Sequence, residues 1–332
     1  MKHINVALFV PHLGCPHNCI FCDQRAISGT REPITREEIE KACKTASASP
    51  HDIADSEIAF FGGSFTAVDR ETQKMCLDAA RPFIGTQFGG IRISTRPDCI
   101  DDDELNFLKS HGVTSIELGA QSMFASVLEM NERGHTPDDT VEASALIRKH
   151  GFSLGLQMMT GLYGSDGEKD IETARRFIAL HPDTVRIYPT VVLKNTRLEE
   201  LYEEKKYTPP SLDEAAEICA RLLEMFRGAG IRVIRLGLHS GGNVGESYIA
   251  GVYHPAFGEI CESIVFRNKA EAILSGRLKG FYKIEVNPRD ISKMTGQKKS
   301  NIKYFGEKGY FLTVSGNGDV PQGEIRAVSE RN

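Results

Sequence analysis

The sequence predicts an α/β fold, a partial (βα)6 TIM-type barrel over residues 1–240 with a small α+β C-terminal extension over residues 241–332. Three observations support this prediction. Apolar, β-branched runs alternate with amphipathic stretches, glycine follows several of those stretches, and the alternation stops near residue 240. Repeated strand–helix units of this kind form a parallel sheet covered by helices. A doubly wound sheet is the alternative, because periodicity alone does not separate the two.

The predicted strands are short apolar runs, each followed by a helix with recognisable end signals. Thr35 and Glu38 form a capping box before the first helix. Gly112, Gly151 and Gly230 come just after three of the helices, where a helix C-terminus prefers glycine. The expected strands are 5–10, 57–61, 91–95, 114–118, 152–159 and 184–189, with a seventh candidate at 231–236. The expected helices are 35–47, 69–83, 101–109, 138–150, 168–180 and 211–227.

The C-terminal part follows a different pattern. A glycine-rich turn at 241–243 precedes a helix-like stretch at 259–274 and strand-like runs at 282–286 and 310–314. No long linker or low-complexity segment separates these elements from the barrel. We therefore expect an extension of the barrel rather than an independently folding domain.

Charge is unevenly distributed along the 332 residues. The whole chain has 40 basic and 45 acidic residues, a net of −5, whereas residues 264–332 have 13 basic and 7 acidic residues, 13 − 7 = +6. A basic tail can meet an anionic partner, although a solvated face is the commoner explanation. No apolar run approaches the roughly 18 residues of a membrane span, and the N-terminus lacks a signal-peptide layout. We expect a cytoplasmic protein without a membrane segment.

Three of the eight cysteines form a cluster, Cys15, Cys19 and Cys22, directly after the first predicted strand. Three thiolates with the spacing C-x3-C-x2-C can hold three corners of a cubane iron–sulfur cluster and leave the fourth iron open. Zinc is the alternative, with His12 or His17 as a fourth ligand, but structural zinc usually uses two paired motifs and only one C-x2-C pair is present. The spacing favours iron–sulfur.

Polar residues or glycines stand at the end of every predicted barrel strand. The carboxyl ends of barrel strands form the rim that carries the chemistry of such folds. A shared cofactor site at this rim is therefore expected. The rim residues are Gly62, Gly63, Ser64, Ser94, Glu117, Gln121, Gln157 and Tyr188.

The cysteine motif, with Phe21 before its last cysteine, resembles that of the radical S-adenosylmethionine (SAM) superfamily. Within it, the chain resembles the radical domain of the Elongator catalytic subunit and, more distantly, the oxygen-independent coproporphyrinogen oxidases. The resemblance covers most of residues 5–260. The segments that carry it are 61–66, 95–98, 117–122, 133–136, 187–190 and 253–258.

The resemblance implies a 4Fe-4S cluster on the three cysteines and S-adenosyl-L-methionine on its open iron. It also implies that Gly62 and Gly63 meet the methionine amino group, that Arg133 meets the carboxylate, and that Gln121 contacts the ribose or the carboxylate. Phe21 would flank the adenine. Three further residues are candidates for binding the cofactor. Ser64 belongs to the glycine motif Gly62-Gly63-Ser64, and Ser94 and Gln157 replace residues typical of these relatives.

The implied function is a radical SAM enzyme that reductively cleaves the cofactor to a 5′-deoxyadenosyl radical and modifies an unidentified substrate. Its electron donor would be a protein such as flavodoxin or ferredoxin. One alternative is a tRNA- or RNA-modifying radical SAM enzyme, and another is a non-catalytic, metal-stapled RNA-binding module. The first alternative depends partly on the basic residues Arg289, Lys293, Lys298, Lys299, Lys303 and Lys308.

Two features of the Elongator subunit are not expected here. Only 14 residues precede Cys15, too few for its basic N-terminal extension, and the chain stops before an acetyltransferase domain could follow. We therefore expect the cofactor chemistry but not acetyl transfer. Tyr188, Arg235 and His239 lie near predicted strand ends and are the candidates for a catalytic residue.

Overall fold

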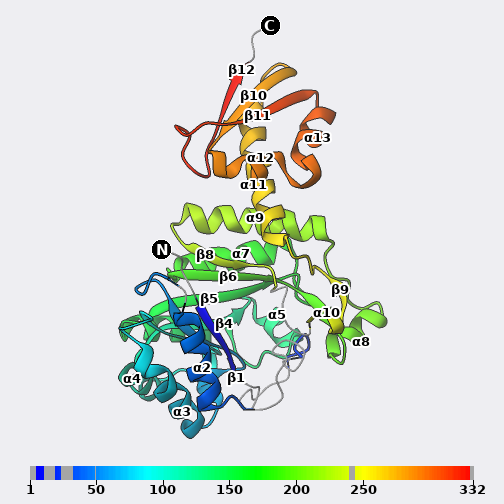
Figure 1. Ribbon diagram of the computed structural model, residues 1–332. Helices are drawn as coiled ribbons and strands as arrows, with labels where there is room; N and C mark the ends of the chain where they lie inside the picture. The colour runs from blue at the N-terminus through cyan, green and yellow to red at the C-terminus, as the bar shows by residue number, and fades with distance from the viewer. Residues whose placement is uncertain (1–4, 11–18, 24–32, 49, 239–243, 330–332) are drawn as a thin grey trace.

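The computed structural model describes residues 5–10, 19–23, 33–48, 50–238 and 244–329. Seven parallel strands form one curled sheet in which each strand lies beside its predecessor (Figure 1). This order has no reversal, which excludes the doubly wound alternative. The predicted partial barrel is confirmed, and the seventh candidate strand belongs to it. The strands are β1 (Asn5–Val10), β2 (Glu57–Gly62), β3 (Gly90–Thr95), β4 (Val113–Gln121), β5 (Ser153–Thr160), β6 (Thr184–Pro189) and β8 (Arg232–Leu236).

Helices cover the outer face of this sheet (Figure 1). The capping box predicted at Thr35 is confirmed, and Thr136 and Ser211 form two more. Such caps satisfy backbone N–H groups that have no acceptor within the helix. The covering helices are α2 (Arg36–Ser47), α3 (Arg70–Ala80), α4 (Asp102–Ser110), α6 (Pro137–Lys149), α7 (Gly167–Ala179) and α9 (Leu212–Gly228).

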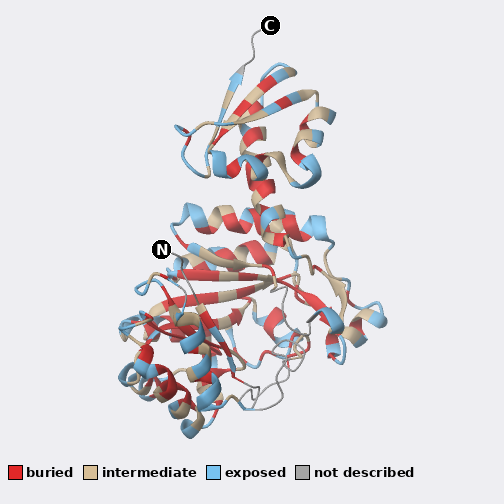
Figure 2. Ribbon diagram, viewed as in Figure 1, coloured by how far each residue is buried: buried red, intermediate tan, exposed pale blue. Residues whose placement is uncertain are grey.

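The core lies between the sheet and these helices, where the strands are drawn mostly in the colour of buried residues (Figure 2). Ile93, Ile116 and Leu156 are fully buried there. Successive side chains of a strand point to opposite faces, so the residues next to them face the concave side of the sheet. Arg92, Glu117 and other polar residues occupy that side. The barrel therefore has an apolar outer layer and a polar interior.

A small cluster of short elements was not predicted. A two-stranded antiparallel ribbon joins β7 (Val191–Leu193) to β9 (Tyr248–Gly251). Val192 of this ribbon packs with Leu198 and Leu201 of α8 (Arg197–Glu203) and with Ile20 of the cysteine loop. This cluster attaches the loop to the barrel. The other short helices here are α5 (Ala125–Met130) and α10 (Val244–Ser247).

The C-terminal unit has its own sheet and its own hydrophobic core. Its central strand β10 (Gly280–Val286) pairs in parallel with β11 (Tyr310–Gly316) and antiparallel with β12 (Ile325–Ser329). Helices α12 (Ile291–Thr295) and α13 (Ser300–Glu307) connect β10 to β11. The strands at 282–286 and 310–314 were predicted, and β12 was not.

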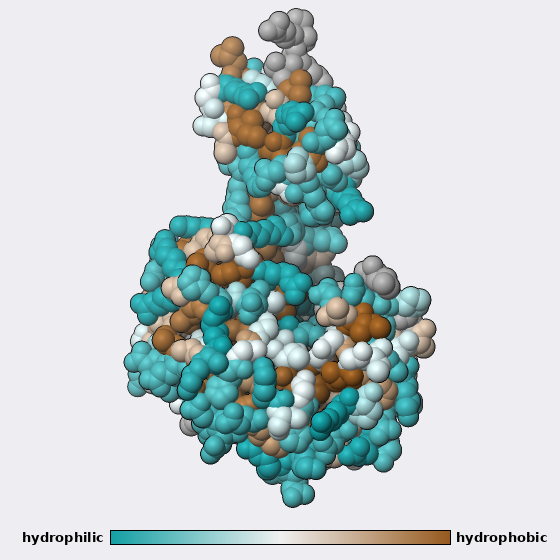
Figure 3. Space-filling view, turned by 90° about the vertical axis from the view of Figure 1, so that its left-hand side faces the viewer, coloured by the Kyte–Doolittle hydropathy of each residue, from teal (hydrophilic) through white to brown (hydrophobic). Residues whose placement is uncertain are grey.

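One long helix, α11 (Phe257–Leu274), connects the two parts (Figure 1). Its first half contributes Cys261 and Val265 to the barrel core, and its second half contributes Phe266 and Leu274 to the C-terminal core. The C-terminal unit also displays apolar residues on the face drawn in Figure 3. Phe281 and Phe311 are among its exposed apolar side chains. Among the described residues, no helix is long and apolar enough to cross a membrane.

Candidate functional site

Two of the three predicted cluster ligands, Cys19 and Cys22, lie in the described part of the structure, and Cys15 lies outside it. A backbone hydrogen bond from Cys22 N–H to the Cys19 carbonyl (3.0 Å) makes a tight turn between them. Ile20 between them is anchored on both sides. Its N–H donates to the carbonyl of Asn131 (3.3 Å), and its carbonyl accepts from the N–H of Leu198 (2.8 Å). The turn is therefore held in place by residues distant in sequence.

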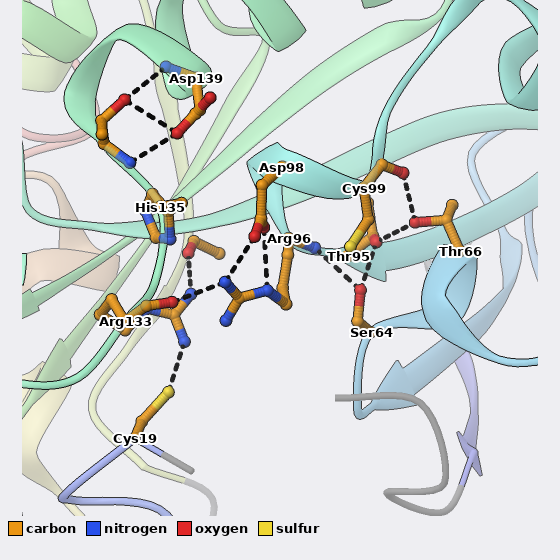
Figure 4. A network of polar contacts seen from close by, with 12 residues as sticks. Cys19, Ser64, Thr66, Thr95, Arg96, Asp98, Cys99, Arg133, His135 and Asp139 are labelled. Carbon is orange, nitrogen blue, oxygen red and sulfur yellow. Dashed lines mark hydrogen bonds and ion pairs between the residues drawn. The ribbon is translucent and has the colours of Figure 1, made fainter. Parts of the chain in front are cut away.

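The guanidinium of Arg133 contacts the sulfur of Cys19. Arg133 Nη1 donates to Cys19 Sγ at 3.1 Å, and Nη2 donates to the carbonyl of Gly119 at the end of β4 (Figure 4). Both side chains are buried. A guanidinium can donate a charge-assisted hydrogen bond to a thiolate, which is the form of cysteine that binds metals. The family resemblance implies that Arg133 meets the cofactor carboxylate, and its contact with Cys19 was not predicted.

A second arginine supports the first. Arg96 Nη2 donates to the main-chain carbonyl of Arg133 at 2.6 Å (Figure 4). The same guanidinium is held by Asp98, with Nε–Oδ1 at 2.9 Å and Nη2–Oδ2 at 2.7 Å. Paired contacts of this kind fix an arginine's orientation as well as its charge. Asp98 and Arg96 therefore hold the segment that presents Arg133 to the cysteine.

His135 is buried behind this pair and is kept neutral. One ring N–H donates to the carbonyl of Ala120 at 3.1 Å, and the other ring nitrogen has no hydrogen-bond partner within the described part of the chain. Burial, together with the charges of Arg133 and Arg96, lowers the pKa of His135 to about 4. A neutral imidazole adds no further positive charge beside the two arginines.

The glycine motif brings the ends of β1 and β2 together. Gly62 has a φ of +112°, and a Cβ on it would lie 2.6 Å from the carbonyl oxygen of Val10. No other residue type fits there without moving the backbone. Ser64 is tied to β3, because its hydroxyl lies 2.7 Å from Thr95 Oγ1 and accepts from the Arg96 N–H at 3.2 Å (Figure 4). Gly63 follows Gly62, and its N–H reaches the Val10 carbonyl at 3.4 Å.

Gln121 ends β4 in a left-handed conformation, with a φ of +64°. Such a conformation is uncommon for a residue with a side chain and is concentrated at functional sites. Its Oε1 atom is buried and has no hydrogen-bond partner among the residues that the structure describes, and the same holds for Nε of Arg133. Buried polar atoms are almost always paired. These two atoms are available to a ligand at the rim.

The concave interior of the barrel holds a network of charged groups. Glu117 lies at its centre, 3.1 Å from Nη1 of Arg92 and 2.7 Å from Nε of Arg186. Gln157 Nε2 donates to Glu117 at 2.8 Å and to Ser94 Oγ at 3.3 Å. Ser94 and Gln157, both predicted, are therefore brought together through this network.

Arg92 and Arg186 were not named as site residues from the sequence. Each arginine stands between two apolar residues of its strand, as in Ile91-Arg92-Ile93, so that apolar and polar side chains alternate. A parallel strand buried on both faces normally reads as a continuous apolar run. This period-two pattern was the signal for a polar interior.

The three catalytic candidates lie in different surroundings. Tyr188 Oη accepts from Arg186 Nη1 at 3.5 Å, and burial raises the pKa of this phenol. Arg235 uses its guanidinium on the carbonyls of Gly237 (2.9 Å) and Leu238 (2.7 Å), the role of a loop cap. His239 lies outside the described residues. Of Tyr188 and Arg235, only Tyr188 has a hydrogen bond to the interior network.

Comparison with known families agrees with this geometry. The model of the radical SAM superfamily matches residues 9–178, and the model of the Radical_SAM C-terminal domain matches residues 182–265. The chain belongs to the radical SAM superfamily. Residues 9–178 include the cysteine motif, the glycine motif and Arg133, and the protein is a radical SAM enzyme.

Individual relatives of this radical SAM enzyme cover only part of its length. It is 30% identical over 259 residues to the tRNA uridine(34) acetyltransferase of Methanocaldococcus jannaschii, spanning 64% of this chain and 47% of that protein. It is 29% identical over 224 residues to human Elongator complex protein 3, spanning 60% of this chain and 40% of that one. The chain thus spans about half or less of the length of these relatives.

Among solved structures, the archaeal Elp3 of Methanocaldococcus infernus with an N-terminal deletion has the same fold. The TM-score is 0.65 at 21% sequence identity, and the superposition covers 84% of this chain and 69% of that chain. Methylornithine synthase also aligns, with a TM-score of 0.50 at 17% identity over 73% of this chain and 75% of that one. At these identities, the likeness concerns the fold.

Proposed function

We propose that the protein binds a 4Fe-4S cluster through Cys15, Cys19 and Cys22 and binds S-adenosyl-L-methionine at the cluster's open iron. The observation that carries this proposal is the buried contact between Arg133 and Cys19 Sγ at 3.1 Å, at the rim of the partial barrel. When bound, these cofactors supply a 5′-deoxyadenosyl radical that abstracts hydrogen from a substrate.

The described residues fit this pair of cofactors. Soft thiolates suit an iron–sulfur cluster, and Cys19 and Cys22 lie on one tight turn. Gln121 Oε1 and Arg133 Nε, which no described residue contacts by a hydrogen bond, supply one acceptor and one donor for a polar ligand beside that turn. Gly62 and Gly63, both half-buried, lie at the same rim. Glycine has no side chain to keep a ligand away from its main-chain groups.

The chain's own residues would bind and orient the two cofactors. Arg133 donates a hydrogen bond to a ligand sulfur, and Arg96 with Asp98 keeps it in position. The cofactor would lie above Gly62, Gly63 and Gln121, with Phe21 at its adenine. Ser64 would act indirectly, because its hydroxyl is already used to hold β3 against β2. Ser94 and Gln157 would line the inner side of the same site, connected to Glu117.

The experiment is anaerobic reconstitution with iron and sulfide, followed by reduction in the presence of S-adenosyl-L-methionine. We expect cluster absorbance and release of 5′-deoxyadenosine. Cys19→Ala should abolish both, whereas Cys43→Ala, a buried thiol in α2, should leave both intact. A colourless protein that binds only zinc would overturn the proposal and favour a metal-stapled module instead.

A finer form of the proposal assigns RNA, in particular tRNA, as the substrate. It is supported by the relatives named tRNA uridine(34) acetyltransferase in Methanocaldococcus jannaschii and in Dehalococcoides mccartyi. The electron donor would be a small redox protein such as flavodoxin or ferredoxin. Adding bulk tRNA should then raise the yield of 5′-deoxyadenosine per cluster. An unchanged yield with tRNA would argue against RNA while leaving the radical chemistry in place.

A further inference from the structure

The C-terminal unit contains a strand–helix–loop–helix–strand segment that the radical chemistry does not use. Strand β10 leads into α12, the loop Gly296-Gln297-Lys298-Lys299 joins α12 to α13, and α13 leads into β11. Strands β10 and β11 are parallel neighbours, and both helices pack on one face of their sheet beside α11 (Figure 1). The loop is thus held on a folded support.

The base of this loop is closely packed. The side-chain amide of Asn301, which is buried, donates to the carbonyls of Ser263 (2.8 Å) and Met294 (3.1 Å). It thereby ties the start of α13 to the end of α12 and to α11. Gly296 has a φ of +75°, and a Cβ on it would lie 2.8 Å from Ser263 Oγ and 3.0 Å from the Asn301 nitrogen. Only glycine fits at this point.

Beyond this base, the backbone turns outward through two lysines. Lys298 and Lys299 have φ values of 50° and 62°, both in the left-handed region, and both side chains are exposed. Lys299 is the N-cap of α13, and no side chain of the described residues caps that helix. The N–H groups in the first turn of a helix have no acceptor within it. Two cations and uncapped amides therefore lie at the same tip.

The charges around the tip are unbalanced. Two cations of this region have acidic partners, Lys293 with Asp290 at 2.9 Å and Lys308 with Glu271 at 2.5 Å. Four others have no ion pair with any described residue, and all four are exposed. An anionic partner would complete this surface, as charge complementarity requires. The four cations are Arg289, Lys298, Lys299 and Lys303.

An apolar side chain adjoins the loop helices. Ile291, the first residue of α12, is 38% exposed, and its Cδ1 lies 3.2 Å from where a Cβ on Gly316 would stand. Gly316 ends β11, which is an edge strand of the three-stranded sheet. The surface from the loop to this strand therefore combines cations with an exposed aliphatic group. A polyanion with flat apolar faces fits both features.

We propose that this surface binds the phosphodiester backbone of a single-stranded nucleic acid, with the loop Gly296–Lys299 as the clamp and Ile291 as a contact for a base. Loops of the form G-x-x-G between two helices clamp backbone nucleotides in K-homology modules. Here the fourth position is Lys299, which adopts the left-handed backbone that glycine favours and adds a charge. The strand bound here would be the RNA substrate of the proposed radical SAM enzyme, and the biological role of this surface rests on that proposed function.

The test uses the full-length, cluster-loaded protein and a fluorescent single-stranded RNA of mixed sequence. Lys298→Asn with Lys299→Asn removes two charges, and asparagine tolerates the left-handed backbone. We expect binding about tenfold weaker at low salt. The plot of log K against log salt has a negative slope, and we expect this slope to become shallower by about 1.4. Each lost phosphate contact on a single strand contributes about 0.7.

Two exposed cations outside the loop provide the matched control, Lys279 and Arg326. Lys279→Asn with Arg326→Asn removes the same charge and should change affinity by less than about twofold. Equal losses in both double variants would mean diffuse attraction and would overturn the clamp. Equal binding of a duplex RNA, or no binding of any single strand, would also overturn it. A single-stranded DNA of the same sequence separates an RNA site from a general backbone site. Binding of either single strand in preference to the duplex supports the clamp.

The outcome is separable from that of the radical chemistry. Both double variants should release 5′-deoxyadenosine at the wild-type rate without RNA, because neither pair lies near the cysteine turn. Loss of strand binding with unchanged nucleoside release would confirm the clamp alone. If reconstitution fails but strand binding still depends on Lys298 and Lys299, the clamp stands and the proposed radical function falls.

Discussion

At the scale of single residues, Arg133 joins the cysteine turn to the barrel rim. It donates to Cys19 Sγ and to the carbonyl of Gly119, and its own carbonyl accepts from Arg96. The sequence identified Arg133 as a site residue only through a family resemblance. Its direct sulfur contact depends on the return of the chain after β4, which no local pattern reports.

This contact predicts a change in the cluster's reduction potential. Hydrogen bonds and positive charge at a ligand sulfur favour the reduced cluster, which is more negative. Arg133→Gln should therefore lower the midpoint potential by roughly 50 mV, the equivalent of about 1 kcal/mol for one electron. A redox titration followed by electron paramagnetic resonance measures it. Arg176→Gln, at a surface arginine of α7, is the control, and an unchanged midpoint in Arg133→Gln at full cluster content would contradict the assignment.

His135 predicts a pH dependence of stability. Burial depresses its pKa from 6.5 to about 4, so the unfolded chain binds a proton that the folded chain does not over this interval. The contribution of His135 to stability is thus present above about pH 6.5 and lost as the pH falls towards 4, by up to about 3 kcal/mol. His135→Gln keeps a donor for the Ala120 carbonyl but does not titrate. Denaturant unfolding at several pH values should show the wild type losing more stability on acidification than this variant, and parallel curves would refute the prediction.

At the scale of elements, long periodic segments were predicted well and short ones were missed. The helix after Thr35 and the strand at 184–189 appear with the expected bounds, because cap residues and apolar periodicity are local signals. The ribbon β7–β9, helix α8 and strand β12 have too few residues for a period to be recognised. Their stability comes from packing against distant segments.

The two halves of helix α11 belong to different hydrophobic cores, so we expect that each core can be destabilised without the other. Phe266 belongs to the C-terminal core and Phe226 of α9 to the barrel core, and both are buried. Phe266→Ala should destabilise the C-terminal unit by about 3–5 kcal/mol, because it leaves a cavity there. Hydrogen exchange should then accelerate in β10 and β11 while β4 and β5 stay protected. Phe226→Ala should show the reverse, and uniform acceleration in both variants would mean one cooperative unit.

At the scale of the whole molecule, the candidate site is assembled from segments far apart in sequence. The cysteine turn is held by Asn131 and Leu198, while Gly62 closes against Val10. A cluster bound to Cys15, Cys19 and Cys22 would therefore link the start of the chain to the rest of the fold. Ligands that bind only the folded state raise its stability by mass action.

Cluster loading is accordingly expected to raise the thermal midpoint of the full chain. The expected rise is at least about 4 °C, corresponding to about 2 kcal/mol. Scanning calorimetry under anaerobic conditions compares the reconstituted and the metal-free protein. Removing the metal with acid and chelator should reverse the shift, and Cys19→Ala should show none. A midpoint unchanged in a fully loaded protein would mean that the cluster binds the unfolded chain as tightly as the folded one, and it would contradict the prediction.

The sequence by itself determined the α/β class, the parallel pairing expected of repeated strand–helix units and the cysteine motif, because these depend on local periodicity, caps and spacing. The strand order, and with it the choice between a partial barrel and a doubly wound sheet, was decided by the tertiary structure. Tertiary structure alone decided that Arg133 meets Cys19, that Glu117 gathers Arg92 and Arg186 inside the barrel, and that Asn301 secures the loop Gly296–Lys299. Such contacts join residues on different strands or helices. Their geometry follows from how the elements pack, and a linear pattern carries no record of it.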